Sequence, residues 1–432
     1  MNRVKVVPLD DIRSIDEAAV GPKAMSLVRM KRAGLPVPAG FCITEAVLRE
    51  HIERNGFTAR LKSLLDKLAQ AGPDVRGTLL ADLRRVIVEA HLAEQIRREI
   101  ESHYNKLGAE RVAVRSSGTA EDLPGHSFAG QHDSYLGIAN SDDCIEAVKK
   151  CRASLWTLRA YEYRQRNGFD HVDIGMAVIV QTLVAADTSG VIFTADPLTG
   201  ARGNIVIEAC FGLGQVLVSG KITPDRFVIR RKRLKLWSRT ISEKKIECVP
   251  DERGSVEERI TPKGRSTALT LDKRQMRRLA KLAIRIEAQF GCPQDIEWGI
   301  CGRKIHLLQS RPITALPAEK SWEDRQIWCG SPVWEVMPDV ATPVTVSMIE
   351  EMLAGFFDPI FRLLCLDRGD HPFFDVIAGR VYFNANIWAS VIGCLPGSGN
   401  FDGTTFAGGH RGLQEVTRRL QVATEDNLPD LK

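Results

Sequence analysis

The sequence has no long apolar run and no recognisable targeting segment. A membrane-spanning helix needs about 20 consecutive apolar residues, and no stretch of the 432 residues approaches that length. Residues 1–18 also lack the apolar core of a signal peptide. We therefore expect a cytoplasmic protein that does not act on a membrane.

A marked excess of charge of either sign is also missing. The chain has 59 lysines and arginines against 54 aspartates and glutamates, a net charge of +5. This balance argues against a dedicated nucleic-acid-binding protein but allows a small anionic substrate. A basic run at residues 230–235 is the strongest sign of a nucleic-acid patch. Because apolar residues flank it, we interpret it as the solvated tip of a β-hairpin.

The ten cysteines are scattered, with no C-x-x-C pair and no zinc-like spacing. In a cytosolic protein we expect them to be reduced thiols. The composition, 44% hydrophobic and 26% charged, is typical of globular proteins and excludes disordered and fibrous classes. At about 100 to 200 residues per domain, the length predicts two to four compact units.

Apolar periodicity predicts a chain of mixed α/β class. The clearest helix spans residues 272–290, where Asp272 can cap the start and Gly291 marks the end. Further helices are expected near 23–33, within 44–104 and within 143–167, and strands near 41–44, 112–117, 174–181, 190–194, 204–209 and 225–241. Two prolines within 312–320 indicate a boundary, beyond which the chain is predicted to be mixed helix and loop.

Residues 295–311 are predicted to form a β-hairpin with one polar face. Side chains alternate along a strand, so Asp295 and Glu297 share a face while the apolar residues between and after them share the other. On the returning strand Gln309 and Arg311 share a face. A three-residue loop would place Glu297 opposite Gln309 and bring all four polar groups together, whereas a two-residue loop would separate them.

These four side chains suit a metal ion bound to phosphate. Two carboxylates, an amide oxygen and a guanidinium can hold Mg²⁺ through oxygen ligands while the cation contacts phosphate oxygens. The set therefore indicates nucleotide triphosphate chemistry. The alternative is an exposed sheet face with an ordinary salt bridge.

Other polar segments supply matching groups. Arg115, at the end of its predicted strand, is placed to bind a phosphate through two hydrogen bonds, and the backbone amides of Gly118 and Thr119 could bind another. Lys23 begins a helix beside Gly21, where positive charge and backbone N–H groups favour anions. Each signal is weak alone, because a single lysine or arginine is usually a surface charge.

Several segments resemble one known family, in order and in register. Residues 114–131, VRSSGTAEDLPGHSFAGQ, closely resemble the nucleotide-binding signature of phosphoenolpyruvate synthases and pyruvate phosphate dikinases. Further matching motifs are GVIFTADP (190–197), FGLG (211–214), TPD (223–225), DIEW (295–298) and LQSRP (308–312). The resemblance covers about residues 1–315 and implies an ATP-grasp-like fold in which two lobes bind ATP between them. The implied divisions are an N-terminal lobe (1–190), a C-terminal lobe (191–315) and a partial, mostly helical linker region (316–432).

The resemblance also implies roles for individual residues. The implied Mg²⁺ ligands are Asp295, Glu297 and Gln309, and the implied phosphate contacts are Lys23, Arg115, Gly118 and Thr119. Arg311 would stabilise the transferred phosphoryl group, with Arg115 as the second catalytic residue, and Gln181 would lie near the adenine hinge. Such a site catalyses in-line transfer mainly by positioning and charge neutralisation.

The sequence departs from the family pattern at two positions. Pro22 replaces the second glycine of a Gly-Gly-Lys motif, which removes a backbone N–H and a flexible position. Gln215 replaces the glutamate of Gly-Leu-Gly-Glu, which removes a carboxylate. Both changes favour an alternative in which the chain binds ATP without turnover.

The last part of the chain resembles the family less sharply. Residues 336–345 and 379–384 are similar to the linker of the synthases and of rifamycin phosphotransferases. The family's swivelling domain, with its phosphate-carrying histidine, and its acceptor-binding domain are not recognised. Gly408-Gly-His410 is only superficially similar to the histidine motif, and we interpret His410 as a loop residue.

The resemblance implies the ATP-binding part of a dikinase-type phosphotransferase. A phosphoryl group from ATP would pass to a histidine of a swivelling domain, either in trans or on a missing C-terminal part. Pyruvate is the acceptor in the synthases, and a rifamycin phosphotransferase or a phenylphosphate synthase component are alternatives.

Overall fold

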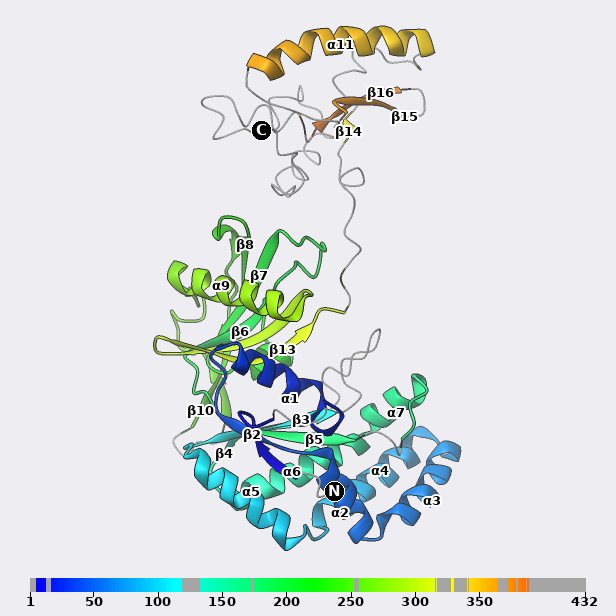
Figure 1. Ribbon diagram of the computed structural model, residues 1–432, viewed down its shortest axis with the longest axis vertical. Coiled ribbons are helices and arrows are strands. Elements are labelled where there is room, and N and C mark those ends of the chain that lie inside the picture. Colours follow the sequence, from blue (N-terminus) through cyan, green and yellow to red (C-terminus); the bar gives the residue numbers. More distant parts are fainter. Residues whose placement is uncertain are drawn as a thin grey trace. The chain divides into compact units, whose positions relative to one another are not determined.

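The computed structural model describes residues 5–12, 17–118, 133–171, 175–251, 256–314, 316, 328–329, 340, 342–363, 372–377, 380–385 and 387. The chain divides into two compact units, Met1–Pro317 and Ala318–Lys432. Figure 1 shows both units coloured along the sequence.

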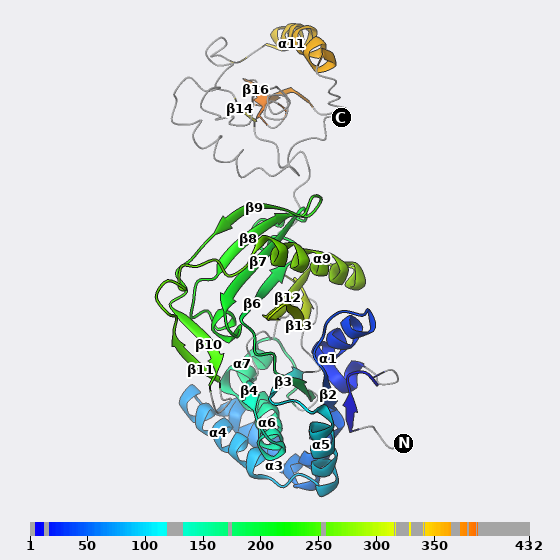
Figure 2. The same cartoon turned by 90° about the vertical axis from the view of Figure 1, so that its left-hand side faces the viewer.

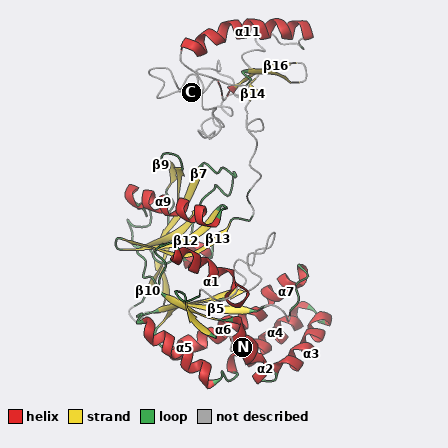
Figure 3. Cartoon of the chain, viewed as in Figure 1, coloured by secondary structure: helices red, strands yellow, loops and turns green. Residues whose placement is uncertain are grey.

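The first unit begins with a five-stranded antiparallel sheet in the order β1-β2-β5-β3-β4. Its strands are β1 (Val6–Pro8), β2 (Gly40–Ile43), β3 (Val112–Gly118), β4 (Ser134–Ile138) and β5 (Met176–Thr182). The predicted helical regions form α2 (Glu45–Arg54), α3 (Phe57–Gln70), α4 (Pro73–Glu89), α5 (Glu94–Leu107), α6 (Ser141–Ala153), the 3-10 turn η1 (Ser154–Trp156) and α7 (Leu158–Arg166). These helices gather on one side of the sheet (Figures 2 and 3). Val112 and Val114 of β3 face that side, in an apolar cluster with Ile100 of α5 and Val148 of α6.

A six-stranded antiparallel sheet follows, in the order β13-β12-β6-β7-β8-β9. Its strands are β6 (Thr188–Phe193), β7 (Asn204–Phe211), β8 (Asp225–Arg230), β9 (Lys235–Thr240), β12 (Gln294–Cys301) and β13 (Lys304–Pro312). The short helix α8 (Gln215–Val218) and a separate hairpin of β10 (Ile246–Pro250) and β11 (Val256–Ile260) flank this sheet. The chain crosses from the first sheet to the second at residues 183–187, slightly before the predicted lobe boundary at residue 190.

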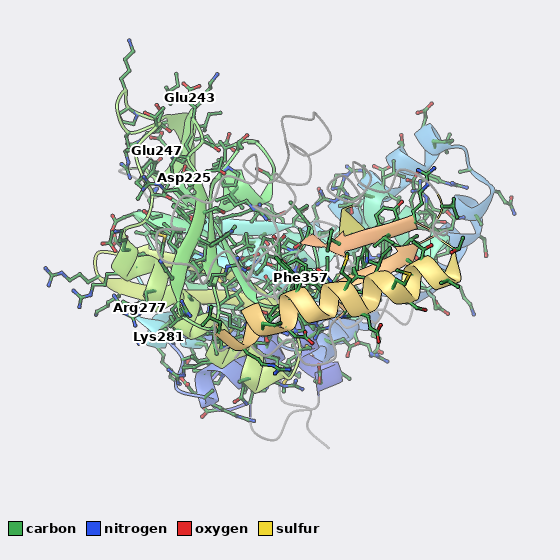
Figure 4. The ribbon with its side chains drawn as sticks, turned by 90° about the horizontal axis from the view of Figure 1, so that it is seen from above. Asp225, Glu243, Glu247, Arg277, Lys281 and Phe357 are labelled. Atoms are coloured by element: carbon green, nitrogen blue, oxygen red, sulfur yellow. The ribbon has the colours of Figure 1, made fainter. Side chains whose placement is uncertain are left out.

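Helix α9 (Lys273–Phe290) covers one face of the second sheet and confirms the prediction from its periodicity. Asp272 forms a capping box with Gln275, and Gly291 ends the helix with a φ of 74°. Figure 4 shows Arg277 and Lys281 pointing away from the sheet, as expected for the polar face of an amphipathic helix.

Helix α1 (Glu17–Arg32) lies between the two sheets (Figures 1 and 2). Gly21 interrupts it with φ 75° and ψ 163°, so a straight helix begins only at Pro22. Leu27 of α1, Ile179 of β5 and Trp298 of β12 belong to one apolar cluster. The first unit therefore has a core that includes both sheets.

The second unit contains α11 (Pro343–Leu363) and a three-stranded sheet, β14-β16-β15, of β14 (Trp328–Cys329), β15 (Phe374–Ile377) and β16 (Arg380–Asn384). Phe361 and Phe373 are buried together, and Phe357 packs against them. The described residues of this unit thus combine a helix with a sheet, whereas the sequence predicted mixed helix and loop.

The basic run at residues 230–235 does connect two strands, β8 and β9, as predicted. It is not fully solvated, however. Arg230 is buried, with its guanidinium carbon 4.1 Å from the centre of the Trp237 ring. Arg231 donates to Glu287 at 2.7 Å. Internal contacts thus occupy two of the cations that a nucleic-acid patch would need.

Two absences expected from the sequence concern membranes and disulfides. Among the helices that the structure describes, none is both long and apolar enough to span a bilayer. The seven cysteines whose side chains are described are all free thiols. Burial raises the pKa of Cys42 and of Cys144 to about 12, which keeps both thiols protonated and unreactive.

Candidate functional site

Arg115 lies in the middle of β3, not at the end of a strand as predicted. Because Val112 and Val114 face the helices, alternation places Arg115 and Ser117 on the opposite face, toward α1 and the second sheet. The Arg115 guanidinium donates to Glu297 Oε2 at 2.5 Å and to the backbone oxygen of Leu308 at 2.9 Å. The first sheet thus contacts the predicted polar hairpin of the second sheet directly.

The hairpin of β12 and β13 places Glu297 opposite Gln309. Cys301 pairs with Lys304, so the loop has two residues, which we expected to separate the two side chains. That expectation was wrong because a β-bulge shifts the register between Glu297 and Trp298. Leu308 is the extra residue on β13, and it restores the pairing.

Asp295 and Arg311 form the second ion pair of this face. Both Nε and an Nη of Arg311 donate to Asp295 Oδ2, at 2.8 and 2.6 Å. The two carboxylates of β12 are half-buried, whereas the Ile296 and Trp298 side chains are fully buried in the core. This alternation confirms the predicted polar face.

Lys23 lies in the first turn of the straight part of α1, and its ammonium acts on Glu297. Burial acts to raise the pKa of Glu297, but the charge and hydrogen bond of Arg115, with the charges of Lys23 and Arg311, outweigh it. The pKa of Glu297 is therefore held below its usual value, and the carboxylate stays ionised. The charges of three predicted cations thus act on one predicted carboxylate, and Arg115 contacts it directly.

Gln181 is buried on β5, immediately before the crossing between the sheets, and its amide donates to the backbone oxygen of Pro38 at 3.3 Å. Gly118 ends β3 and pairs with Met176. Thr119 and His410 lie outside the described residues. The site residues that the structure describes therefore come from α1, β3, β5, β12 and β13.

Glu208 on β7 is a further carboxylate of this face that sequence reasoning missed. It pairs with Val191, which in turn pairs with Glu297 on the other side. Burial and the charges of Asp295 and Asp196 raise the pKa of Glu208 against the opposing charge of Arg226. The available signal was the alternation within residues 204–211, where Glu208 is the only charged residue.

The oxygen donors of the site fit a hard cation such as Mg²⁺. Asp295, Glu297 and Gln309 supply carboxylate and amide oxygens, which this ion prefers. Among the described residues no group of three or more His, Cys, Asp or Glu side chains could hold a metal alone. Asp295, Glu297 and Gln309 could hold such an ion only together with further ligands such as phosphate and water.

Comparison with known proteins agrees with this chemistry. Residues 17–327 match the family described as pyruvate phosphate dikinase, AMP/ATP-binding domain. The chain is 38% identical over 318 residues to a probable phosphoenolpyruvate synthase of Methanocaldococcus jannaschii, covering 72% of this chain and 27% of the relative. It is 36% identical over 349 residues to a rifampicin phosphotransferase of Bacillus subtilis, covering 79% of this chain and 40% of the relative. The chain thus spans less than half the length of these relatives.

A D-alanine–D-alanine ligase from Bacillus anthracis is similar over 52% of this chain and 57% of the ligase, with 9% identity and a TM-score of 0.22. A score this low supports no argument. The two-sheet architecture confirms the predicted α/β class. The residues that match the family, 17–327, include strands of both sheets. The chain therefore belongs to the family of pyruvate phosphate dikinase AMP/ATP-binding domains.

Proposed function

We propose that the first unit binds Mg-ATP and starts a dikinase-type phosphoryl transfer to a histidine on a separate swivelling domain. The observation that carries this proposal is the contact of Arg115 on the first sheet with Glu297 on the second. This contact brings cations and carboxylates from different elements together at one site. A nucleotide triphosphate with its metal requires both kinds of group.

In this proposal the arginines exchange partners when Mg-ATP binds. Lys23, Arg115 and Arg311 bind the phosphate oxygens, for which guanidinium groups are well suited. Asp295, Glu297 and Gln309 would hold Mg²⁺, which would supply positive charge to offset that of the phosphates. The charge of the two carboxylates, which contact arginines in this structure, would then be compensated by the cation.

An apolar cluster beside the crossing at residues 183–187 suits the nucleotide base. Val184, Ala186 and Leu213 belong to it, and Leu308 of the bulged strand packs against it. Base sites are mostly apolar with a few polar groups that fix orientation. Gln181, which precedes the crossing, would supply one of them.

A non-catalytic ATP-binding module is the second candidate, and Gln215 favours it. Its side chain is exposed at the start of α8, where the family has a glutamate. Pro22 favours it less than the sequence indicated. Pro22 occupies the first helical position after Gly21, where a backbone N–H has no intrahelical partner and proline is well tolerated.

Calorimetry with Mg-ATP tests the binding, and labelled ATP tests the transfer. We expect saturable binding to the chain alone and label transfer to the histidine of an added swivelling domain from a relative, with AMP and phosphate as further products. Binding without transfer would favour the module. No binding at millimolar Mg-ATP would refute both. Pyruvate and a rifamycin are the acceptors to supply in the complete assay, because relatives of both kinds match.

A further inference from the structure

The straight part of α1 begins directly against β3, where Gly21 packs closely on Ser117. Ser117 is fully buried on the face of β3 that bears Arg115. A Cβ added at Gly21 would lie 2.5 Å from Ser117 Oγ and 2.8 Å from the Ser117 backbone oxygen. With its φ of 75°, this position requires glycine both for space and for conformation.

Ser117 also supplies a hydrogen bond that the helix lacks locally. A helix normally begins with a residue whose side-chain oxygen accepts from the second or third backbone N–H. Gly21 precedes the helix and has no such oxygen. The N–H of Ala24, the third helical residue, donates instead to Ser117 Oγ at 3.4 Å. The cap therefore comes from a strand 93 residues later in the sequence.

A second contact fixes the next turn of the same helix. Ser26 Oγ donates to the backbone oxygen of Ser310 at 2.6 Å, and Ser310 follows Gln309 on β13. Lys23 directly precedes Ala24 and lies one turn before Ser26, so both anchors, one on each sheet, follow it closely in the helix. The backbone of Lys23 therefore has a defined position relative to β3 and β13, which carry Arg115 and Gln309.

We propose that Ser117 is a positioning residue that holds Lys23 in register with the phosphates of ATP. This inference rests on the proposed function. Ser117 acts through the helix and not by touching the nucleotide, since its side chain is fully buried beneath Gly21. It thus differs in role from Arg115, which lies two residues earlier on the same face and is partly exposed.

The neighbouring Ser116 provides a matched control. It is also buried, but it faces the opposite side of β3, and its hydroxyl is among the buried described groups without a hydrogen-bond partner. We expect Ser117→Ala to weaken Mg-ATP binding about tenfold by calorimetry. We expect Ser116→Ala to bind within about twofold of the wild type, because no positioning contact is lost.

A double-mutant cycle with Lys23→Ala separates positioning from the alternatives. If Ser117 acts through Lys23, Ser117→Ala causes no further loss of Mg-ATP affinity in the Lys23→Ala background. A loss that persists there would show direct contact with the nucleotide and overturn the proposal. Unchanged affinity of Ser117→Ala, with only a lower melting temperature, would show a purely structural role and also overturn it.

Two further measurements keep the test decisive. Ser117→Cys fills the site with a slightly larger side chain and a weaker acceptor. It replaces the alanine variant in the cycle if that variant does not fold. The wild type is titrated in parallel. If the wild type itself does not bind Mg-ATP, the proposed function fails and this inference fails with it. If the wild type binds and all serine variants bind equally, only the inference fails.

Discussion

Two ion pairs of the first unit differ in how many hydrogen bonds their carboxylates accept and in how deeply they are buried. Asp225, the first residue of β8, and Lys244 are both 0% exposed. Asp225 Oδ1 accepts from Lys244 and the Ser242 N–H, and Oδ2 accepts from the N–H and hydroxyl of Thr270. In the site, Arg115 and Glu297 are 21% and 22% exposed, and only Oε2 of Glu297 accepts from the arginine.

This difference separates a structural pair from an exchangeable one. Each carboxylate oxygen of Asp225 accepts two hydrogen bonds. Removal of a partner therefore leaves a buried charge that is not compensated. Glu297 keeps one oxygen available for another ligand, and its partner can turn toward an anion.

Lys244→Ala should have the largest effect on stability. The substitution leaves Asp225 buried without its cation, and breaking such a pair costs about 3–5 kcal/mol. Urea unfolding measures the loss. Lys245→Ala is the control, because Lys245 is 74% exposed and should cost less than about 1 kcal/mol. Equal losses for the two variants would contradict the distinction.

Glu297→Gln should have the largest effect on ligand binding. We expect Mg-ATP affinity to fall at least about tenfold, because the amide binds Mg²⁺ less well than a carboxylate. The free energy of unfolding should change by less than about 1 kcal/mol, as for other partly exposed pairs. Glu257→Gln, an exposed carboxylate on β11, is the control for calorimetry. Unchanged Mg-dependence in Glu297→Gln would place the metal elsewhere.

The pH dependence of stability should reveal the same pair with a smaller effect. The folded pKa of Glu297 lies below its ordinary value of 4.5. Its contribution to stability is therefore complete above that value and is lost as the pH falls through the lower, folded pKa. The wild type should lose stability over this acid range more steeply than Glu297→Gln. Parallel unfolding curves in acid would show that the pair does not lower the pKa.

An exposed pair should show the smallest effect. Arg97 and Asp142 lie 2.5 Å apart but are 46% and 75% exposed. Solvent screens such a pair, so Arg97→Ala should change the free energy of unfolding by no more than about 0.5 kcal/mol. Thermal unfolding at low and high salt measures it. A larger change would mean that distance, and not burial, governs these pairs.

Sequence patterns predicted the helices and most strands because their apolar periodicities are local. Helix α9 and the polar face of β12 are examples, since alternation and capping require no knowledge of distant residues. The register of the β12–β13 hairpin was harder to predict. The pairing of Glu297 with Gln309 depends on a two-residue loop combined with a bulge, and neither has a clear signal in the sequence.

The remaining features depend on contacts between segments that are distant in sequence. Glu208 joins the site only because β7 lies two strands from β12, an order that no local pattern encodes. The cap from Ser117 to Ala24 has the same origin. The roles of Lys23 and Gln181 remain predictions from resemblance.

The placement of α1 has a consequence for dissecting this protein. A cut at the crossing, residues 183–187, would appear to release two independent halves. The N-terminal fragment would instead carry Val20, Leu27 and Met30, which are at most 2% exposed in the intact chain, without the second sheet that helps to cover them. Such a fragment should aggregate, whereas co-expression of both halves should restore a soluble pair. The chain is therefore suited to complementation between fragments and not to the isolation of either one.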